Sequence, residues 1–196
     1  MRGWQWWPMV IVMVVVIGRG AGTAEAASGN ADGTYTVTVT KIEMSKDAGA
    51  TYVTVFSGSQ AINIASASAG ATAASLVSGV ALAPGTYTHV RVTIGATMTA
   101  KGYVNISGST WYTDGGTDSG AFSSNAGNDT PGADYAISTF TIPEANRTTT
   151  DTSLSMTVRA GGAGPTCGVS FDTSGVIINN GGSPSLGAPT VTMSSS

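Results

Sequence analysis

Apolar and polar residues alternate in short runs along most of this chain, and glycine-rich breaks separate the runs. A period of two residues is typical of a half-buried β-strand, because successive side chains of a strand point to opposite faces. The clearest run spans residues 87–94. Its apolar positions, expected in the core, are Val90, Val92 and Ile94, and its polar positions, expected to face solvent, are His89, Arg91 and Thr93.

The run that begins at Thr34 changes phase along its length. Its apolar and aromatic residues occupy odd positions up to Val39, whereas Ile42 and Met44 continue the pattern at even positions. A shift of one residue predicts a β-bulge, or a strand that passes from one sheet to another, near residues 40–41.

Shorter runs predict the other strands, and small polar residues predict the turns between them. The strands are expected at 34–40, 51–56, 61–64, 87–94, 103–106, 135–142, 153–158, 168–171 and 176–178, with 190–193 as an additional candidate, and the turns at 46–49, 57–59 and 84–85. Residues 73–77 fit either a short helix or a crossover between sheets. This density of strands predicts an all-β fold, an antiparallel Greek-key β-sandwich of the immunoglobulin or transthyretin type, with about eight or nine strands and at most one short helix.

The first 26 residues have the pattern of a secretory signal peptide. Arg2 provides a positive start, residues 9–17 form an apolar stretch, and Ala24 and Ala26 are small residues at a cleavage site. The stretch is shorter than the roughly 20 apolar residues of a membrane-spanning helix. We therefore expect a cleaved signal peptide at 1–26, with an uncleaved anchor as the alternative. Residues 27–196 then form one domain in the periplasm, outside the cell or on its surface.

The composition narrows the choice of partners. The chain has 8 basic and 11 acidic residues, and cleavage would remove two of the basic residues, Arg2 and Arg19, but one acidic residue, Glu25. Because an acidic chain has no basic surface to neutralise phosphates, we expect no nucleic acid as a partner. We also expect no stable membrane insertion after cleavage. Cys167 is the only cysteine, and it fits either a buried thiol or an intermolecular disulfide.

The stretch Leu82–Val92, with its Pro-Gly turn followed by Thr-Tyr-Thr-His-Val-Arg-Val, resembles a stretch of the domain-of-unknown-function 4382 family of secreted prokaryotic proteins. The strand and hairpin at 37–56 are similar to that family, and so is the ending of the chain from Phe171 to Val191. The loop at 113–134 departs from it. The resemblance implies a secreted β-sandwich at the cell surface, and it implies no catalytic residue.

The loop at 113–134, an insertion in the predicted sandwich, is rich in glycine, aspartate and asparagine. Calcium takes about six to eight oxygen ligands, and glycine lets a loop wrap around the ion. The candidate calcium ligands are therefore Asp114, Asp118, Asp129 and Asp134. Their spacing does not match an EF-hand, and a solvated insertion without a metal is the alternative. We expect no other cofactor.

Trp111 and Tyr112 precede this loop, and Tyr103 lies earlier on the same predicted hairpin. Exposed aromatic rings stack well on sugars, so Trp111 and Tyr112 are candidate residues for binding a polysaccharide. Neighbouring residues on a strand point to opposite faces, so at most one of the two is exposed while the other fills the core. A purely structural role in the core is the alternative.

Familiar catalytic motifs are absent from the sequence. His89 is the only histidine, and no nucleophile elbow, phosphate-binding loop or dinucleotide fingerprint is present. We therefore expect a non-catalytic structural or adhesive protein. The uncharged strand at 34–40 and the terminal strand within 180–196, behind a Gly/Ser/Pro linker, offer edges for assembly into a homo-oligomer or fibre. Pairing of both segments within one domain is the structural alternative, and a carbohydrate-binding or calcium-stabilised recognition module is the functional one.

Overall fold

The structure, a computed structural model, describes residues 13–17, 28–29, 31–65, 72–75, 82–125, 136–161, 167–173, 175–180, 183–187 and 190–195. Regular structure in these ranges consists of strands and of two single turns of 3-10 helix, η1 (Asp118–Gly120) and η2 (Glu144–Asn146). No helix in the described ranges is long and apolar enough to cross a membrane. The prediction of an all-β sandwich built mainly from antiparallel strands is confirmed.

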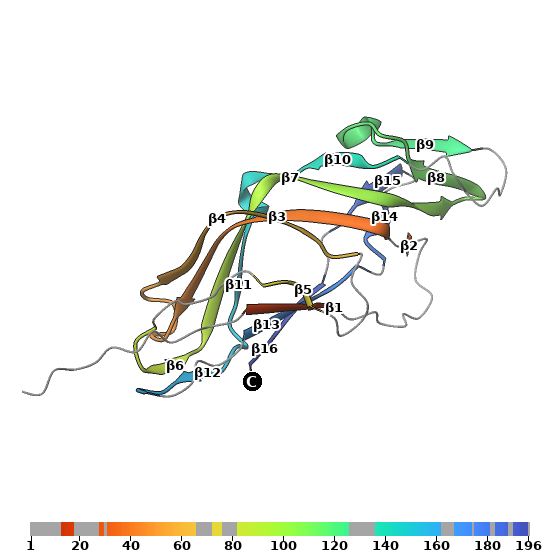
Figure 1. Ribbon diagram of the computed structural model, residues 1–196. Helices are drawn as coiled ribbons and strands as arrows, with labels where there is room; N and C mark the ends of the chain where they lie inside the picture. The colour runs from red at the N-terminus through yellow and green to blue at the C-terminus, as the bar shows by residue number, and fades with distance from the viewer. Residues whose placement is uncertain are drawn as a thin grey trace, which may run out of the picture.

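Two long antiparallel strands form the centre of the first layer (Figure 1): β3 (Ala31–Ser45) and β7 (His89–Ile106). The edge of β3 that faces away from β7 pairs with β4 (Val53–Asn63). The other edge of β7 pairs in succession with β11 (Thr148–Asp151), β10 (Ser138–Thr141) and β8 (Ser109–Thr113), and β8 pairs with β9 (Phe122–Asn125).

This first layer bends in the middle, as the paths of β3 and β7 show (Figure 1). Val37 pairs with Met98 but Val39 pairs with Ile94, so β7 has extra residues at 95–97 between the two pairs. Extra residues on one strand of a pair bend and twist the sheet. A second register shift lies between Val39 and Lys41, on both sides of β3, which confirms the bulge predicted there.

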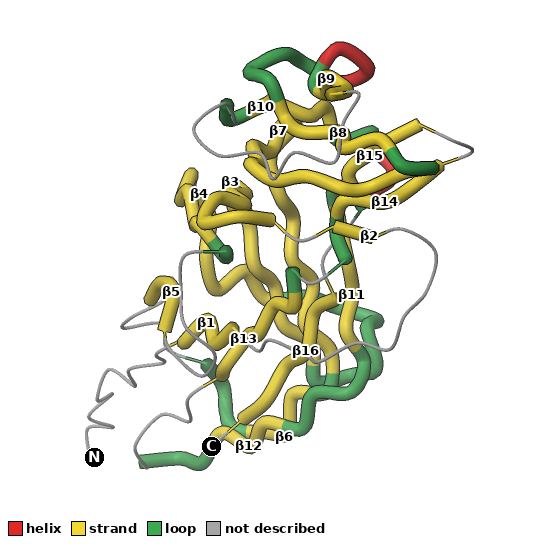
Figure 2. Tube along the Cα trace, turned by 90° about the vertical axis from the view of Figure 1, so that its right-hand side faces the viewer, coloured by secondary structure: helices red, strands yellow, loops and turns green. Residues whose placement is uncertain are grey.

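The second layer contains a long broken hairpin. Its first arm consists of β13 (Cys167–Asp172) and β14 (Ile177–Asn180), and its second arm of β15 (Ser183–Leu186) and β16 (Thr190–Ser195). A hydrogen bond from Gly187 N to Val176 O, at 2.6 Å, joins the two halves. Figure 2 shows β13 and β16 side by side, below β14 and β15. The prediction of a linker after residue 180 is therefore wrong, because β15 occupies it and pairs with β14.

Short strands complete the fold. β2 (Ser28–Gly29) pairs with β14 in the second layer, and β6 (Gly85–Tyr87) pairs with β12 (Met156–Val158) in a separate two-stranded sheet. Residues 76–77 lie outside the described residues. Residues 73–75 form neither the helix nor the crossover considered for 73–77, because they belong to a strand, β5 (Thr72–Ser75). It pairs with β1 (Met13–Ile17), and β1 in turn runs parallel to β13.

Two further predictions about strands are corrected. The turn expected at 57–59 does not form, because β4 runs unbroken from Val53 to Asn63 and its Ser-Gly-Ser segment is exposed on the edge of the sheet. The expected open edge at 34–40 does not exist either, because β3 pairs with β4 on one side and β7 on the other. Pairing within the domain, the alternative, holds for β3 and for β16.

The core lies between the two layers and is centred on buried aromatic and branched aliphatic residues. Tyr35 is fully buried, and its hydroxyl donates a hydrogen bond to Gly187 O at 2.9 Å. Burial raises the pKa of this phenol. Tyr35 therefore ties β3 of the first layer to the end of β15 in the second. Of the residues expected in the core from the run 87–94, Val90 is buried, whereas Val92 and Ile94 are partly exposed.

Candidate functional site

The acidic loop begins with a carboxylate that is used inside the loop. Asp114 Oδ1 accepts a hydrogen bond from Gly116 N at 3.0 Å, and Asp114 Oδ2 accepts one from the hydroxyl of Ser123 on β9. These two bonds, the Ser123 bond first, lower the pKa of Asp114. The side chain of Asp114 therefore holds the start of the loop against β9, a strand within the loop.

Asp118 fixes the same loop to the first layer. Its φ of 48° is in the left-handed region, which aspartate tolerates better than most residues. Both carboxylate oxygens accept hydrogen bonds from Thr141 on β10, from the backbone N at 2.6 Å and from the hydroxyl at 2.9 Å. A backbone hydrogen bond from Thr139 N to Gly116 O supports the same contact. Hydrogen bonds accepted by residues 116 and 118 therefore attach the first part of the loop to β10.

This geometry bears on the calcium ligands predicted from the sequence. Asp114 and Asp118 each direct their oxygens to partners in the protein, and Asp129 and Asp134 lie outside the described residues. Within the described part of the chain no three His, Cys, Asp or Glu side chains come together as a metal site. Calcium binding stays a prediction, and the structure gives the two described carboxylates a different role.

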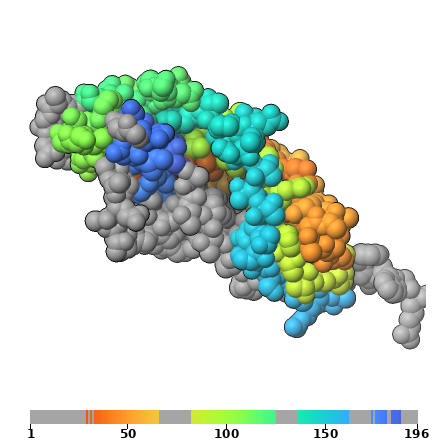
Figure 3. Space-filling model, turned by 180° about the vertical axis from the view of Figure 1, so that it is seen from behind, coloured from red at the N-terminus to blue at the C-terminus, as the bar shows by residue number. Residues whose placement is uncertain are grey.

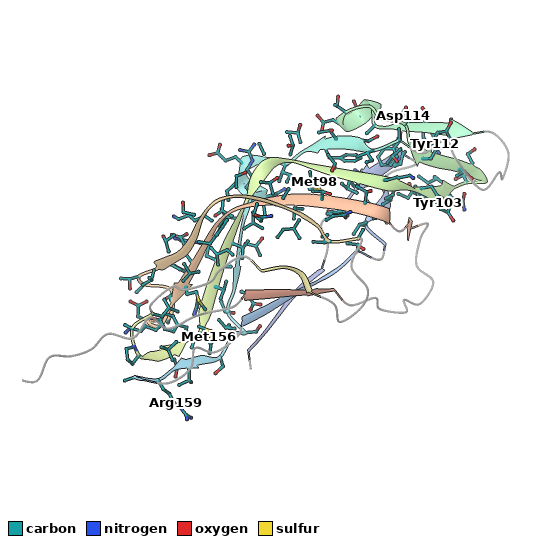
Figure 4. All side chains as sticks on the ribbon, viewed as in Figure 1. Met98, Tyr103, Tyr112, Asp114, Met156 and Arg159 are labelled. Atoms are coloured by element: carbon teal, nitrogen blue, oxygen red, sulfur yellow. The ribbon has the colours of Figure 1, made fainter. Side chains whose placement is uncertain are left out.

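The aromatic residues before the loop divide between the two faces of the β7–β8 hairpin. Trp111 packs against the core beside its cross-strand partner Val104. Tyr112 is directly opposite Tyr103, and both are partly exposed on the other face, as Figure 4 labels. Trp111 and Tyr112 therefore point to opposite faces of the hairpin, as expected, and both are half-buried. Sequence reasoning predicted that Tyr103 lies on this hairpin, but it did not predict that Tyr103 is directly opposite Tyr112.

A cluster of charges lies on the same outer face at the other end of the sheet. The Glu43 side chain is 8% exposed, and its carboxylate receives Lys41 Nζ at 2.6 Å and Arg91 Nε at 2.8 Å. The Arg91 guanidinium lies 3.9 Å from the centre of the Tyr52 ring. The hydrogen bond from Arg91 is the main reason why the pKa of Glu43 is lowered. The cluster is internally satisfied, so its evident role is to hold β3 and β7 together.

The strand β1 occupies a place that the sequence did not predict. It pairs with β13 over five residues, from Met13 opposite Cys167 to Ile17 opposite Phe171, and it pairs with β5 on its other side. These five residues lie in the apolar stretch of the predicted signal peptide. An apolar run fits a leader and a buried strand equally well, so the sequence held no signal that distinguishes the two.

An open cavity of about 500 Å³ lies on the concave side of the bend in the first layer. Its floor consists of apolar side chains of β3 and β7: Val37, Val39, Val92, Ile94 and Met98. Phe122 and Phe140 form one wall, with ring centres 5.6 Å apart, and residues 184–187 form the opposite wall. Seen from behind, the molecule is hollowed between β15 (blue) and the segment of β10 and β11 (cyan), as Figure 3 shows.

The polar groups of the cavity come from its rim. Arg147, which follows η2, donates from Nε to Ile142 O at 2.9 Å, and its own carbonyl accepts a hydrogen bond from Ile94 N at 2.8 Å. Asp118, on the loop, also lines the cavity. The alternation of apolar residues predicted Val92 and Ile94 of the floor as core, but no local pattern in the sequence indicates that the bend leaves space above them.

These elements provide an apolar cavity with a polar rim, an aromatic pair on the outer face and a sheet completed by β1. Comparison with known proteins gives no further guide to their use. No family model, no curated protein and no solved structure matches this chain.

Proposed function

We propose that the mature protein is a secreted, non-catalytic structural subunit of the cell surface that assembles with its own copies by exchanging β-strands. The observation that supports this is the position of β1. A strand from the predicted signal peptide lies inside a sheet, in the order β16-β13-β1-β5.

Cleavage after Ala26 would remove β1 in one piece. In the described part of the chain, β13 would then keep β16 as its only neighbour, and β5 would keep none. The backbone N–H and C=O groups along one edge of β13, from Cys167 to Phe171, would lose the strand that they pair with. An open edge of this kind is a template for a strand from another molecule.

The parallel direction of the β1–β13 pair favours a second copy as the donor. A parallel partner within one chain needs a crossover connection of about a dozen residues or more, and apart from β5 the described strands of the mature chain keep partners in the sheets. A strand of another copy has no such restriction. The sequences of β13 and β16 also contain no lysine or arginine, the residues with which exposed edges commonly discourage pairing.

The test compares the precursor with the secreted, cleaved protein by light scattering after size-exclusion chromatography and by electron microscopy. We expect oligomers or fibres of the cleaved protein and monomers of the precursor. A synthetic peptide of residues 10–18 should occupy the edge of β13 and reduce the oligomers to monomers. The same peptide with Val15→Pro is the matched control, because proline removes an N–H from the ladder.

A cleaved protein that stays monomeric at millimolar concentration contradicts the proposal. So does an oligomer that the peptide and its proline control affect equally, because that oligomer would use another surface.

A second candidate function is binding of a polysaccharide, and the pair of Tyr103 and Tyr112 favours it. The two rings are cross-strand neighbours, and Ser123, opposite Tyr112 on β9, and the Asp114 carboxylate bonded to it add polar groups beside them. Aromatic rings with adjacent hydrogen-bonding groups suit sugars. A glycan array with the wild-type protein and Tyr112→Ala tests it, with Tyr52→Ala as the control; equal signals from all three proteins would exclude this face.

A further inference from the structure

We propose that the cavity under the bend binds a small amphipathic carboxylate, with its apolar body against the floor of β3 and β7 and its carboxylate on Arg147. This site is separate from the strand edge of β13 and does not depend on assembly.

The size and the lining of the cavity fit a small ligand. Its volume of about 500 Å³ lies within the range of about 300–1,000 Å³ that is usual for small-molecule sites. Val92, Ile94 and Met98 are only partly buried although they face inward, so they expose apolar surface to this space. Covering apolar surface stabilises a complex by about 25 cal/mol per Å² before the costs of association.

The position of Arg147 selects an anion. The bond from its Nε to Ile142 O and the bond that its carbonyl accepts from Ile94 N hold both its side chain and its backbone at the rim. Among the described residues no carboxylate lies within 4 Å of this guanidinium, since the ion pairs there are those of Glu43. A fixed guanidinium with its terminal N–H groups still to be paired is the group that proteins use to hold carboxylates.

The acidic residue of the same lining does not compete for Arg147. Both oxygens of Asp118 accept hydrogen bonds from Thr141, so this carboxylate is already bonded to β10. A cationic ligand would lie beside the positive charge of Arg147, and the Asp118 carboxylate is already bonded and does not offset that repulsion. A sugar would place its hydroxyls on an apolar floor, where unpaired polar groups are costly. An apolar body with one carboxylate satisfies both parts of the site.

The test measures binding of decanoate, decanol and decylammonium to the full protein by isothermal titration calorimetry. We expect decanoate to bind at least tenfold more tightly than decanol and decylammonium to bind weakest. Arg147→Gln should reduce the affinity for decanoate about tenfold and leave decanol unchanged. The matched control is Arg159→Gln, because Arg159 is exposed at the far end of the molecule from Met98 on the cavity floor (Figure 4), and this variant should bind all three as the wild type does.

A second variant tests the floor. Ile94→Phe should fill the cavity and weaken decanoate and decanol by the same factor, with thermal melting as the check that the protein is folded. The proposal is overturned if decanoate does not bind, if decanoate and decanol bind equally, or if Arg159→Gln loses as much affinity as Arg147→Gln. The Arg147 and Arg159 variants decide the question even if Ile94→Phe fails to fold.

Discussion

The contribution of Glu43 to stability can be tested by replacing it with glutamine, which keeps its shape and removes its charge. The carboxylate accepts from Arg91 at 2.8 Å and pairs with Lys41 at 2.6 Å. A hydrogen bond to a charged group contributes about 1.5–3 kcal/mol. Because the side chains of Arg91 and Lys41 are 34% and 43% exposed, solvent weakens both pairs, and we take the lower value for Arg91 and about 0.5 kcal/mol for Lys41. Glu43→Gln should therefore lower the free energy of unfolding by about 2 kcal/mol at pH 7.

The pH dependence separates this charge effect from a packing effect. The pKa of Glu43 is lower in the folded protein than its usual value. Its contribution is therefore fully present above the pKa of the unfolded chain, and it is lost as the pH falls through the folded pKa. The difference between wild type and Glu43→Gln should shrink from pH 7 to pH 3. Urea denaturation at both pH values measures it, and Glu144→Gln, at an exposed position, is the control. An equal difference at pH 7 and pH 3 would refute the charge argument.

Three other substitutions test contacts between elements. Tyr35→Phe leaves the carbonyl of Gly187 without its donor and should cost about 1–2 kcal/mol in urea denaturation; no change would mean that water replaces the hydroxyl. Asp118→Ala removes two hydrogen bonds to β10, so amide hydrogen exchange should become faster in β10 but not in β4. An equal increase in both strands would contradict the attachment of the loop to β10. Gly29→Ala places a methyl group against the backbone carbonyl of Tyr103. It should lower the melting temperature more than Gly120→Ala, whose methyl group meets no neighbour; the reverse order would contradict the close approach.

Much of the strand pattern follows from local sequence. The phase change between Val39 and Ile42 predicted the bulge at 40–41, because side-chain alternation reports directly which face a residue occupies. The division of Trp111 and Tyr112 between two faces follows from the same rule. The turn expected at 57–59 failed for a related reason, since polar and glycine residues are tolerated on an exposed edge strand as well as in a turn.

The arrangement of the candidate sites depends on contacts that no local pattern contains. Asp118 reaches Thr141 only because η1 folds back over β10. The cavity exists because the extra residues at 95–97 bend β7 away from the opposite wall, which comes from 184–187. Likewise, the alternation of apolar and polar residues predicts that β13 is a strand, but it does not predict that β1 lies beside it.

The pairing of β3 with β7 also has a consequence for how fast the chain folds. Residues 31–45 must find residues 89–106, and the loop between them has to close before the pair gains any stability. Three strands pair along the far edge of β7, and two of them, β10 and β11, are likewise distant from β7 in sequence. Sheets dominated by such distant contacts fold in about milliseconds to seconds. We expect secondary structure to appear on that slow timescale and in one step, with the formation of the β3–β7 pair as the event that limits the rate.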